Sequence, residues 1–343
     1  MDALEIMPED INTSADLHKL PILTKQLIKE NFDKLKSNDS YGIGMSKVTS
    51  GGSTGELGII YRSKYFEAMS RASWLRNNSM VGWMPEDKVV WLWTSPTEHV
   101  SYLNGLKVRF GMWLNRRMFL NAFNYSKSDF LLWFNKIKKF KPKVIFGNPS
   151  IILEFSEFLL DNNLSLHSVK MIVTTTEKLK NREIIAKAFN ATVHDQYGCS
   201  EIIAIGIEHE PYQMFFTDDV VLVTTTHEHE FLLTPLFSYG FPLINYKVGD
   251  VGEIKGAQVD SKQFPFPKIN LKIGRTTDRF LTKEHRKIST SSLGSYLASL
   301  DLGIKEHQLE QSDYNVFTIN YVALESTNYK SYKQKVKRVL EEY

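Results

Sequence analysis

The residues from Thr49 to Gly55 read Thr-Ser-Gly-Gly-Ser-Thr-Gly and combine backbone freedom with side-chain hydroxyls. Glycines let a backbone turn tightly and direct its N–H groups inward, while hydroxyls supply further donors. Such a loop can surround the phosphates of a nucleotide. It is not a Walker A loop, because no Gly-Lys-Ser/Thr follows it. A surface loop that binds nothing is the alternative interpretation.

A second candidate segment runs from Asp195 to Glu201 and reads Asp-Gln-Tyr-Gly-Cys-Ser-Glu. It ends a predicted parallel strand, and ligands of α/β sheets bind at that end of the strands. The ring of Tyr197 can stack on a purine. The Glu201 carboxylate can hold Mg²⁺ against phosphate oxygens, because Mg²⁺ prefers hard oxygen ligands and often shares them with a nucleotide. An acid at a helix N-terminus is the alternative for Glu201.

Two later residues have the chemistry to bind a ribose. Asp250 follows Gly249 in Pro-Leu-Ile-Asn-Tyr-Lys-Val-Gly-Asp, and its carboxylate can accept two hydrogen bonds from a ribose diol. Arg275, in Gly-Arg-Thr-Thr-Asp, offers a planar fork to ribose or phosphate oxygens. A plain turn aspartate and an inter-domain salt bridge are the alternatives for these two residues.

The elements that must position these residues alternate between strand and helix over the first two hundred positions. Apolar periodicity and short β-rich runs distinguish the two kinds of element. We predict helices at 65–77, 127–139, 150–161 and 181–189, and strands at 88–93, 144–146, 169–174 and 192–197. Such alternation is typical of parallel βαβ units.

After about residue 210 the pattern changes. Residues 220–226 and 230–234 predict antiparallel strands, with His227 to His229 as the turn between them. These two histidines could touch one metal ion, although an exposed turn is the alternative. Further helices are predicted at 288–299 and 329–343, on either side of a strand at 316–323. The predicted fold is a large multi-layer α/β domain at 1–277 with an added antiparallel part, followed by a small α+β domain at 278–343.

The composition narrows the class of function. The net charge of +3 is small and the basic residues are dispersed, so nucleic acid is not an expected partner. The single cysteine, Cys199, excludes a disulfide framework within the chain and favours a reducing compartment. No apolar run reaches the roughly 18 residues of a membrane span. We therefore expect a cytoplasmic protein, and the sequence does not indicate its oligomeric state.

Taken together and in this order, the four segments resemble the adenylate-forming superfamily. Within it they resemble the phenylacetate–CoA ligase branch, which includes the CapK-like proteins of capsular and surface polysaccharide biosynthesis. Three more segments carry the resemblance: Leu20 to Lys25 (LPILTK), Phe140 to Ser150 (FKPKVIFGNPS) and Thr174 to Leu179 (TTTEKL). The resemblance covers about residues 17 to 290.

The resemblance implies that a substrate carboxylate attacks the α-phosphate of ATP, and that the acyl-adenylate then passes its acyl group to CoA or a carrier thiol. It implies a phosphate-binding loop made of Ser50, Gly51, Gly52, Ser53, Thr54 and Gly55. Thr54, Ser200 and Glu201 become the catalytic residues, with Ser200 at the α-phosphate and Glu201 on Mg²⁺. The adenine and ribose would lie among Glu177, Asp195, Tyr197, Gly198, Asp250 and Arg275, and Asp278 becomes the hinge of the small domain.

The acid itself should bind near residues 88–124 and the start of the helix after Pro149. The candidates there are Trp93, His99, Asn148, Pro149 and Gly198. Aromatic walls suit an aryl or alkyl acid. The alternative for His99 is an ordinary structural histidine.

The chain also departs from the pattern of the family. Glu56 and Leu57 stand where relatives often carry proline and lysine, Thr176 replaces a glycine, and Asn245 replaces an arginine. Relatives carry a lysine in a late glycine-containing segment, and no such segment precedes Tyr343. The resemblance therefore predicts a truncated small domain. Two alternatives stay open: a nucleotide- or acyl-binding pseudoenzyme or partner subunit, and an acyltransferase that works without ATP.

Overall fold

A computed structural model shows two compact units, each built from separate stretches of the chain. Unit 1 contains Met1–Ser50, Gly58–Met80 and Gln196–Gly274, and unit 2 contains Gly51–Leu57, Val81–Asp195 and Arg275–Tyr343. The domain boundary predicted near Asp278 lies outside the described residues and stays a prediction. The structure describes residues 6–39, 43–50, 58–94, 105–255, 266–273, 279–281, 287–289, 304–314, 316–323, 330, 333–334 and 336–338.

Unit 2 is built on parallel strands. Their order is β7-β6-β3-β4, and the three adjacent pairs are parallel. The strands are β3 (Val89–Trp93), β4 (Arg117–Asn121), β6 (Val144–Gly147) and β7 (Met171–Thr175). All four residues of β6 are buried, as expected for a strand covered on both faces. Leu92 of β3 lies opposite Gly147, and a Cβ on that glycine would come within 2.3 Å of the Leu92 carbonyl oxygen.

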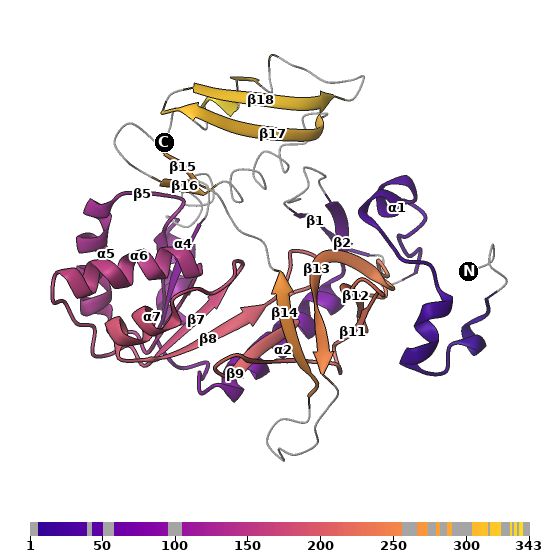
Figure 1. The fold of residues 1–343 in the computed structure, drawn as a ribbon, viewed down its shortest axis with the longest axis horizontal. Coiled ribbons are helices and arrows are strands. Elements are labelled where there is room, and N and C mark those ends of the chain that lie inside the picture. The colour runs from indigo at the N-terminus through magenta and orange to yellow at the C-terminus, as the bar shows by residue number, and fades with distance from the viewer. Residues whose placement is uncertain are drawn as a thin grey trace. The chain divides into compact units, whose positions relative to one another are not determined.

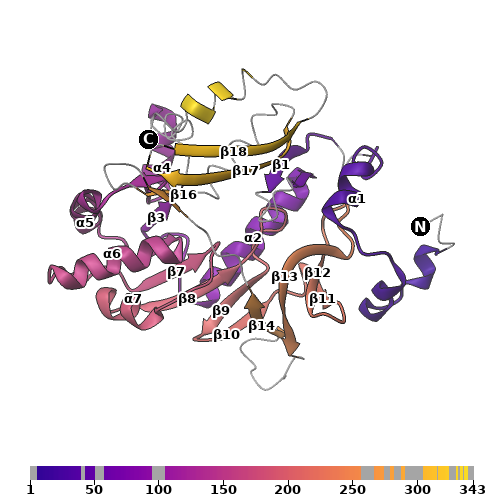
Figure 2. The ribbon, with the colours of Figure 1, turned by 45° about the horizontal axis from the view of Figure 1, so that its top comes forward.

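Between residues 81 and 195, the described helices of unit 2 are α4 (Leu106–Leu114), α5 (Lys127–Phe140), α6 (Pro149–Asp161) and α7 (Arg182–Phe189). Three of them, α5, α6 and α7, bury one face in a core that they share with these strands, whereas α4 buries none of its described side chains. Helix α5 begins with a capping box between Ser126 and Asp129, and its buried residues 130, 133, 134 and 137 follow the helical period. Figures 1 and 2 both show α6 and α7 next to β7, and residues of these elements share one hydrophobic core.

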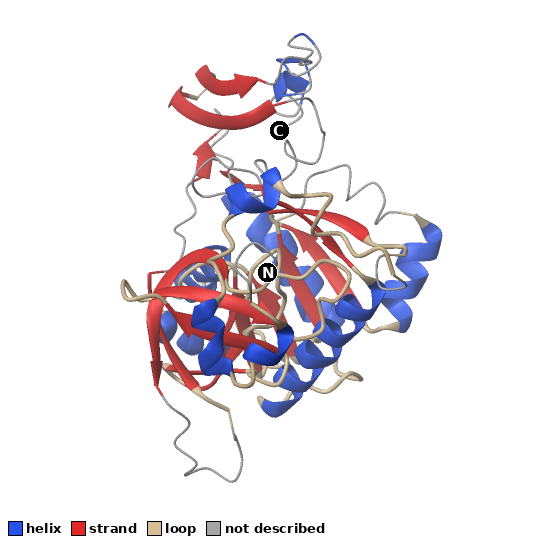
Figure 3. Cartoon of the chain, turned by 90° about the vertical axis from the view of Figure 1, so that its right-hand side faces the viewer, coloured by secondary structure: helices blue, strands red, loops and turns tan. Residues whose placement is uncertain are grey.

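Unit 1 is mainly antiparallel. Its strands are ordered β11-β12-β13-β14-β10-β9. They are β9 (Gly206–Glu210), β10 (Gln213–Phe216), β11 (Val221–Thr225), β12 (Glu230–Pro235), β13 (Tyr246–Lys255) and β14 (Lys268–Ile273). Strand β8 (Thr192–Tyr197) begins in unit 2, and its last two residues belong to unit 1. Figure 3 distinguishes the strands from the helices.

The remaining elements of unit 1 lie early in the chain. Strands β1 (Ser46–Ser50) and β2 (Gly58–Arg62) pair antiparallel. Helix α1 (Lys25–Glu30) is capped by the Thr24 hydroxyl, and it follows two 3₁₀ turns at Pro8–Asp10 and Ser14–Lys19. Helix α2 (Lys64–Met80) is the longest helix among the described residues, and one end of it leads out of β2.

The last described elements are strands of unit 2. Strand β16 (Lys287–Ser289) pairs with β15 (Arg279–Leu281) and with β5 (Asn124–Tyr125). Strands β17 (Ile304–Asp313) and β18 (Val316–Ala323) form an antiparallel pair. The helix predicted at 288–299 is wrong at its start, because Ile288 and Ser289 belong to β16. Its other residues lie outside the described ones.

The predicted mixed α/β class is confirmed, and so is the antiparallel pairing of β11 with β12. Strand β18 has the predicted bounds, and the described residues of the predicted last helix are helical at 330, 333–334 and 336–338. Strand β17 was not predicted, because its sequence IKEHQLEQSD is polar on both faces. Among the helices that the structure describes, none is long and apolar enough to cross a membrane.

Candidate active site

The glycine-rich segment is approached from two paired strands. Ser50 at the end of β1 lies opposite Gly58 at the start of β2, so the two ends of the segment are held side by side. Residues 51–57 themselves lie outside the described residues, as do His99, Arg275 and Asp278. The roles predicted for Gly51, Gly52, Ser53, Thr54, Gly55 and these three residues therefore stay predictions.

Tyr197 and Asp250, predicted separately for the purine and the ribose, meet inside unit 1. The Tyr197 hydroxyl donates to Asp250 Oδ2 at 2.8 Å, and both residues are 7% exposed. Asp250 lies within β13, so its interpretation as a turn residue is wrong. The hydrogen bond joins the end of β8 to β13, and it fixes the direction of the carboxylate.

A bulge in β13 accounts for the position of Asp250. Leu232 of β12 lies opposite Lys247, but Glu230 lies opposite Val251, so β13 carries two extra residues over this stretch. Gly249 has a φ of +92°, a left-handed conformation that favours glycine. The glycine before the aspartate is thus required by the backbone.

Glu201 is also held by a tyrosine of β13. Its Oε1 accepts a hydrogen bond of 2.7 Å from the Tyr246 hydroxyl, and each residue is 1% exposed. Glu201 lies in a bend between β8 and β9, not at the start of a helix, so the helix N-terminal interpretation is wrong. Burial, followed by the charge of Glu201, raises the pKa of the Cys199 thiol well above its ordinary value.

Arg62, the last residue of β2, donates to the backbone carbonyl of Ser200. Burial lowers the pKa of the Arg62 guanidinium, and the charges of Glu67, Cys199 and Glu201 act in the opposite direction. The contact connects the strand that leaves the glycine-rich segment with the segment that carries Ser200 and Glu201. Ser200 itself is exposed, whereas Gly198 is half-buried.

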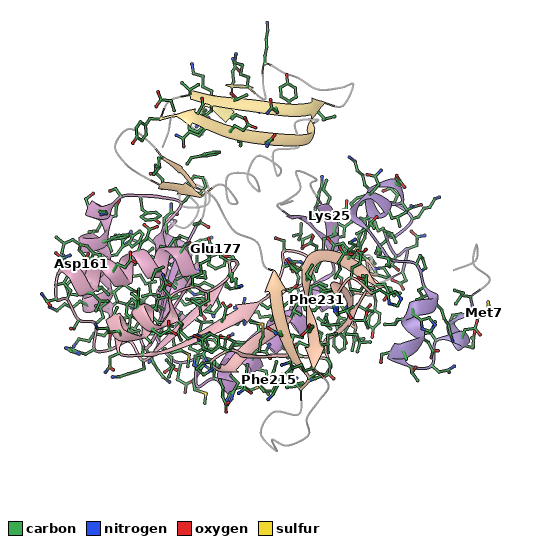
Figure 4. The ribbon with its side chains drawn as sticks, in the orientation of Figure 1. Met7, Lys25, Asp161, Glu177, Phe215 and Phe231 are labelled. Atoms are coloured by element: carbon green, nitrogen blue, oxygen red, sulfur yellow. The ribbon has the colours of Figure 1, made fainter. Side chains whose placement is uncertain are left out.

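In unit 2, three separate hydrogen bonds join residues at the end of β7 to the start of α6 and to β8. The Thr174 hydroxyl donates to Asp195 Oδ1 at 2.7 Å, and the Ser150 hydroxyl donates to the Glu177 carboxylate. Asn148 Nδ2 donates to Thr176 Oγ1 at 2.6 Å. Figure 4 labels Glu177 beside the helices of unit 2. The predicted substrate residue Asn148 and the predicted nucleotide residues Asp195 and Glu177 therefore each take part in a hydrogen bond that involves residue 174, 176 or 177, just at or after the end of β7.

The backbone conformation of Thr176 explains why relatives have a glycine at this position. Its φ is +80°, in the left-handed region that a β-branched residue rarely adopts. The other predicted substrate residues of unit 2 are half-buried Trp93, whose ring centroid lies 6.0 Å from that of Trp91, and Pro149, which is the first residue of α6 and is buried.

Glu201 is the residue predicted to bind Mg²⁺, and its surroundings show whether the site suits this ion. Among the described residues there is no group of three or more metal-binding side chains. A magnesium ion that is shared with a nucleotide needs only one or two protein carboxylates, and Glu201 offers a hard oxygen donor of that kind. Its 1% exposure means that the carboxylate is covered in this structure. The donor type of Glu201 fits the ion.

Two residues of this site were not predicted. Tyr246 lies four residues before Asp250, in the segment from Pro242 to Asp250. This closeness to a predicted site residue is the signal in the sequence that could have identified it. Arg62 had none, because nothing in its neighbourhood distinguishes it from a surface arginine that ends a strand.

Comparison with known proteins finds no matching family model. The chain is 24% identical over 330 residues to protein CapK of Staphylococcus aureus. The matched region covers 88% of this chain and 68% of CapK. It is 25% identical over 283 residues to phenylacetate-coenzyme A ligase of Escherichia coli K12. This second match covers 73% of this chain and 60% of the ligase. The chain thus spans about two thirds of the length of the first relative and less of the second.

Solved structures show the same fold. A 2-hydroxyisobutyryl-CoA ligase in complex with 2-HIB-AMP and CoA, in its thioesterification state, has a TM-score of 0.62 at 14% identity, covering 99% of this chain and 78% of that one. Its open conformation has a TM-score of 0.60, also at 14% identity, and covers 99% and 79%. The sequence similarity to CapK and to a phenylacetate-coenzyme A ligase confirms the predicted resemblance to the adenylate-forming CoA ligases and to CapK, and the solved structures show that the fold is shared.

Proposed function

We propose that this chain is an adenylate-forming ligase that activates a carboxylic acid with ATP and passes the acyl group to a thiol. The observation that carries the proposal is the convergence of two distant segments in unit 1. Tyr197 bonds to Asp250, and Glu201 bonds to Tyr246. The segment after β8 and the strand β13 are therefore joined by two tyrosine–carboxylate hydrogen bonds. The similarity in sequence to a phenylacetate-coenzyme A ligase supports the same reaction class.

These residues contribute position and charge, because phosphate displacement asks little covalent work of a protein. Asp250, with its carboxylate directed by Tyr197, is suited to accept hydrogen bonds from a ribose diol. Ser200 is exposed and available to an α-phosphate oxygen. Glu201 would hold Mg²⁺, which supplies neutralisation of phosphate charge when it is bound.

The acceptor and the biological setting extend the proposal. We propose CoA or a carrier thiol as the acceptor, on the basis of the coenzyme A ligase relative. A role in surface polysaccharide biosynthesis is supported by the similarity to CapK. The acid is a small molecule.

Exchange of labelled pyrophosphate into ATP, stimulated by a carboxylic acid, tests the ligase. We expect some acid of a broad panel to support exchange, and Glu201→Ala to lower the rate at least a hundredfold, because it removes the carboxylate that would hold Mg²⁺ at the reacting phosphates. Glu157→Ala is the control, since Glu157 is exposed on α6. Equal rates in wild type and Glu201→Ala would remove Glu201 from the catalytic residues.

A pseudoenzyme that binds nucleotide without activating an acid is the second candidate. The burial of Glu201 favours it, because a covered carboxylate cannot reach a metal ion or a phosphate. Binding of ATP, measured by calorimetry, together with no exchange from any acid of the panel, would support this candidate and contradict the ligase. Acyl transfer from a thioester in the absence of ATP would support the third, transferase alternative.

A further inference from the structure

The start of helix α6 carries a buried amide that is not used in the usual way. Asn148 is the N-cap residue of α6, a position at which asparagine normally accepts a hydrogen bond from a backbone N–H of the first turn. Here its side chain makes no such bond. The backbone carbonyl of Asn148 still begins the helix, by accepting from the Ile152 N–H at 3.1 Å. The side chain is therefore committed elsewhere.

One half of this amide has a partner and the other half does not. Nδ2 donates to Thr176 Oγ1 at 2.6 Å. Asn148 is only 3% exposed, and no atom in the described part of the chain bonds to its Oδ1. A buried acceptor without a donor costs free energy, so each such group in a native structure needs an explanation.

The partner of the amide is itself strained. Thr176 is β-branched, yet it has a φ of +80°. It is exposed, whereas its hydrogen-bond partner Asn148 is buried. Residues in such conformations cluster at ligand sites, where the surroundings hold them. The exposed threonine also shows that this edge of unit 2 is open to solvent.

The Glu177 carboxylate, like Asn148 Oδ1, can accept a hydrogen bond from a ligand. Ser150 is the second residue of α6, and its hydroxyl donates to the carboxylate of Glu177, the residue after Thr176. Asn148 Oδ1 and the Glu177 carboxylate both accept hydrogen bonds, and neither can donate one when Glu177 is ionised. A ligand that binds here is therefore favoured when it brings a donor.

We propose that Asn148 and Thr176 select an acid that carries a hydrogen-bond donor, a hydroxyl or an ammonium group, over the matching hydrocarbon acid. This inference rests on the proposed function and names its substrate class. It narrows the aryl or alkyl acid that the aromatic residues predicted to one that carries such a donor. The physical reason is that binding a hydrocarbon leaves Asn148 Oδ1 buried without a donor, whereas a hydroxyl or ammonium satisfies it.

The test uses pairs of acids that differ by one group. Acid-dependent pyrophosphate exchange is measured with propionate, lactate, alanine and pyruvate, and with 3-phenylpropionate, 3-phenyllactate, phenylalanine and phenylpyruvate. We expect kcat/KM for the hydroxy or amino member to exceed that of the hydrocarbon member at least tenfold in one series. Asn148→Leu should reduce this ratio to within about twofold of one, while Asn148→Asp, which keeps an acceptor, should preserve the preference.

Asn162→Leu is the matched control, because Asn162 is the exposed C-cap of the same helix. Thermal unfolding of each variant shows whether it folds, and the ratio is compared only among variants that do. A ratio near one in the wild type, or one that Asn148→Leu leaves unchanged, overturns the inference but not the ligase. Preference for the keto acids also overturns it, since these offer an acceptor. Absence of exchange with every acid contradicts the ligase itself, and the inference falls with it.

Discussion

The two units hold their candidate residues in different ways. In unit 1, Asp250 and Glu201 are buried, and each carboxylate accepts a hydrogen bond from a buried tyrosine. In unit 2, Asn148 is equally buried, but it bonds to an exposed threonine with a left-handed backbone. The residues of unit 1 are positioned by hydrogen bonds between buried side chains, whereas in unit 2 the partner of Asn148 has a strained backbone. Such an arrangement is expected where a ligand completes the contacts.

The largest effect is expected from loss of a hydroxyl in unit 1. Tyr246→Phe removes the hydrogen bond that the buried Glu201 carboxylate accepts from the tyrosine hydroxyl, and we expect the free energy of unfolding to fall by about 1–3 kcal/mol. Urea unfolding at pH 7 measures it. Tyr212→Phe, at a tyrosine that is 74% exposed, should change it by less than about 0.5 kcal/mol. Equal small effects would show that unit 1 does not depend on this contact, and the contrast between the units would be lost.

Much of the parallel part of unit 2 was predictable from the sequence. Helices α5, α6 and α7 bury strictly periodic residues, and β6 is an apolar run that ends at Gly147-Asn-Pro, so local pattern and tertiary position agree. The strand β17 was not predictable in the same way, since its residues do not alternate between apolar and polar.

The site was predictable as a set of segments but not as a set of contacts. The motifs placed Tyr197 and Asp250 with one ligand, and the structure brings them to 2.8 Å. Nothing in the sequence showed that Glu201 bonds to Tyr246 or that Arg62 reaches Ser200, because those contacts depend on the register of β13 and on the bend after β8. The positive φ of Thr176 could be suspected only from its replacement of a glycine.

The second expected effect concerns the charge inside unit 1. Burial and Glu201 raise the pKa of the Cys199 thiol, so the folded protein keeps its proton above the ordinary pKa of about 8.5, whereas the unfolded chain loses it. The unfolded state then binds fewer protons, and stability falls as pH rises above about 8.5, by up to about 1.4 kcal/mol per pH unit. The stabilising contribution of the neutral thiol is complete below that pH.

Urea unfolding of wild type and Cys199→Ala at pH 7.5, 8.5 and 9.5 measures this slope. The wild type should lose more stability than the variant between the last two values. Equal slopes of unfolding free energy against pH in the two proteins would mean that the thiol has the same pKa in the folded and the unfolded state. The surroundings of Cys199 and Glu201 would then be open to water.

The smallest expected effect measures the strain in unit 2. Thr176→Ala and Thr176→Gly both remove the hydroxyl that accepts from Asn148, so the difference between them reports the backbone alone. At a φ of +80° we expect the glycine variant to be more stable than the alanine variant by about 1 kcal/mol, because only glycine adopts this conformation without a Cβ clash. Lys136, exposed within α5, provides the opposite case, since alanine should exceed glycine there by about 1 kcal/mol. If alanine is also the more stable residue at position 176, this part of unit 2 stores no strain, and the contrast between the two units is lost.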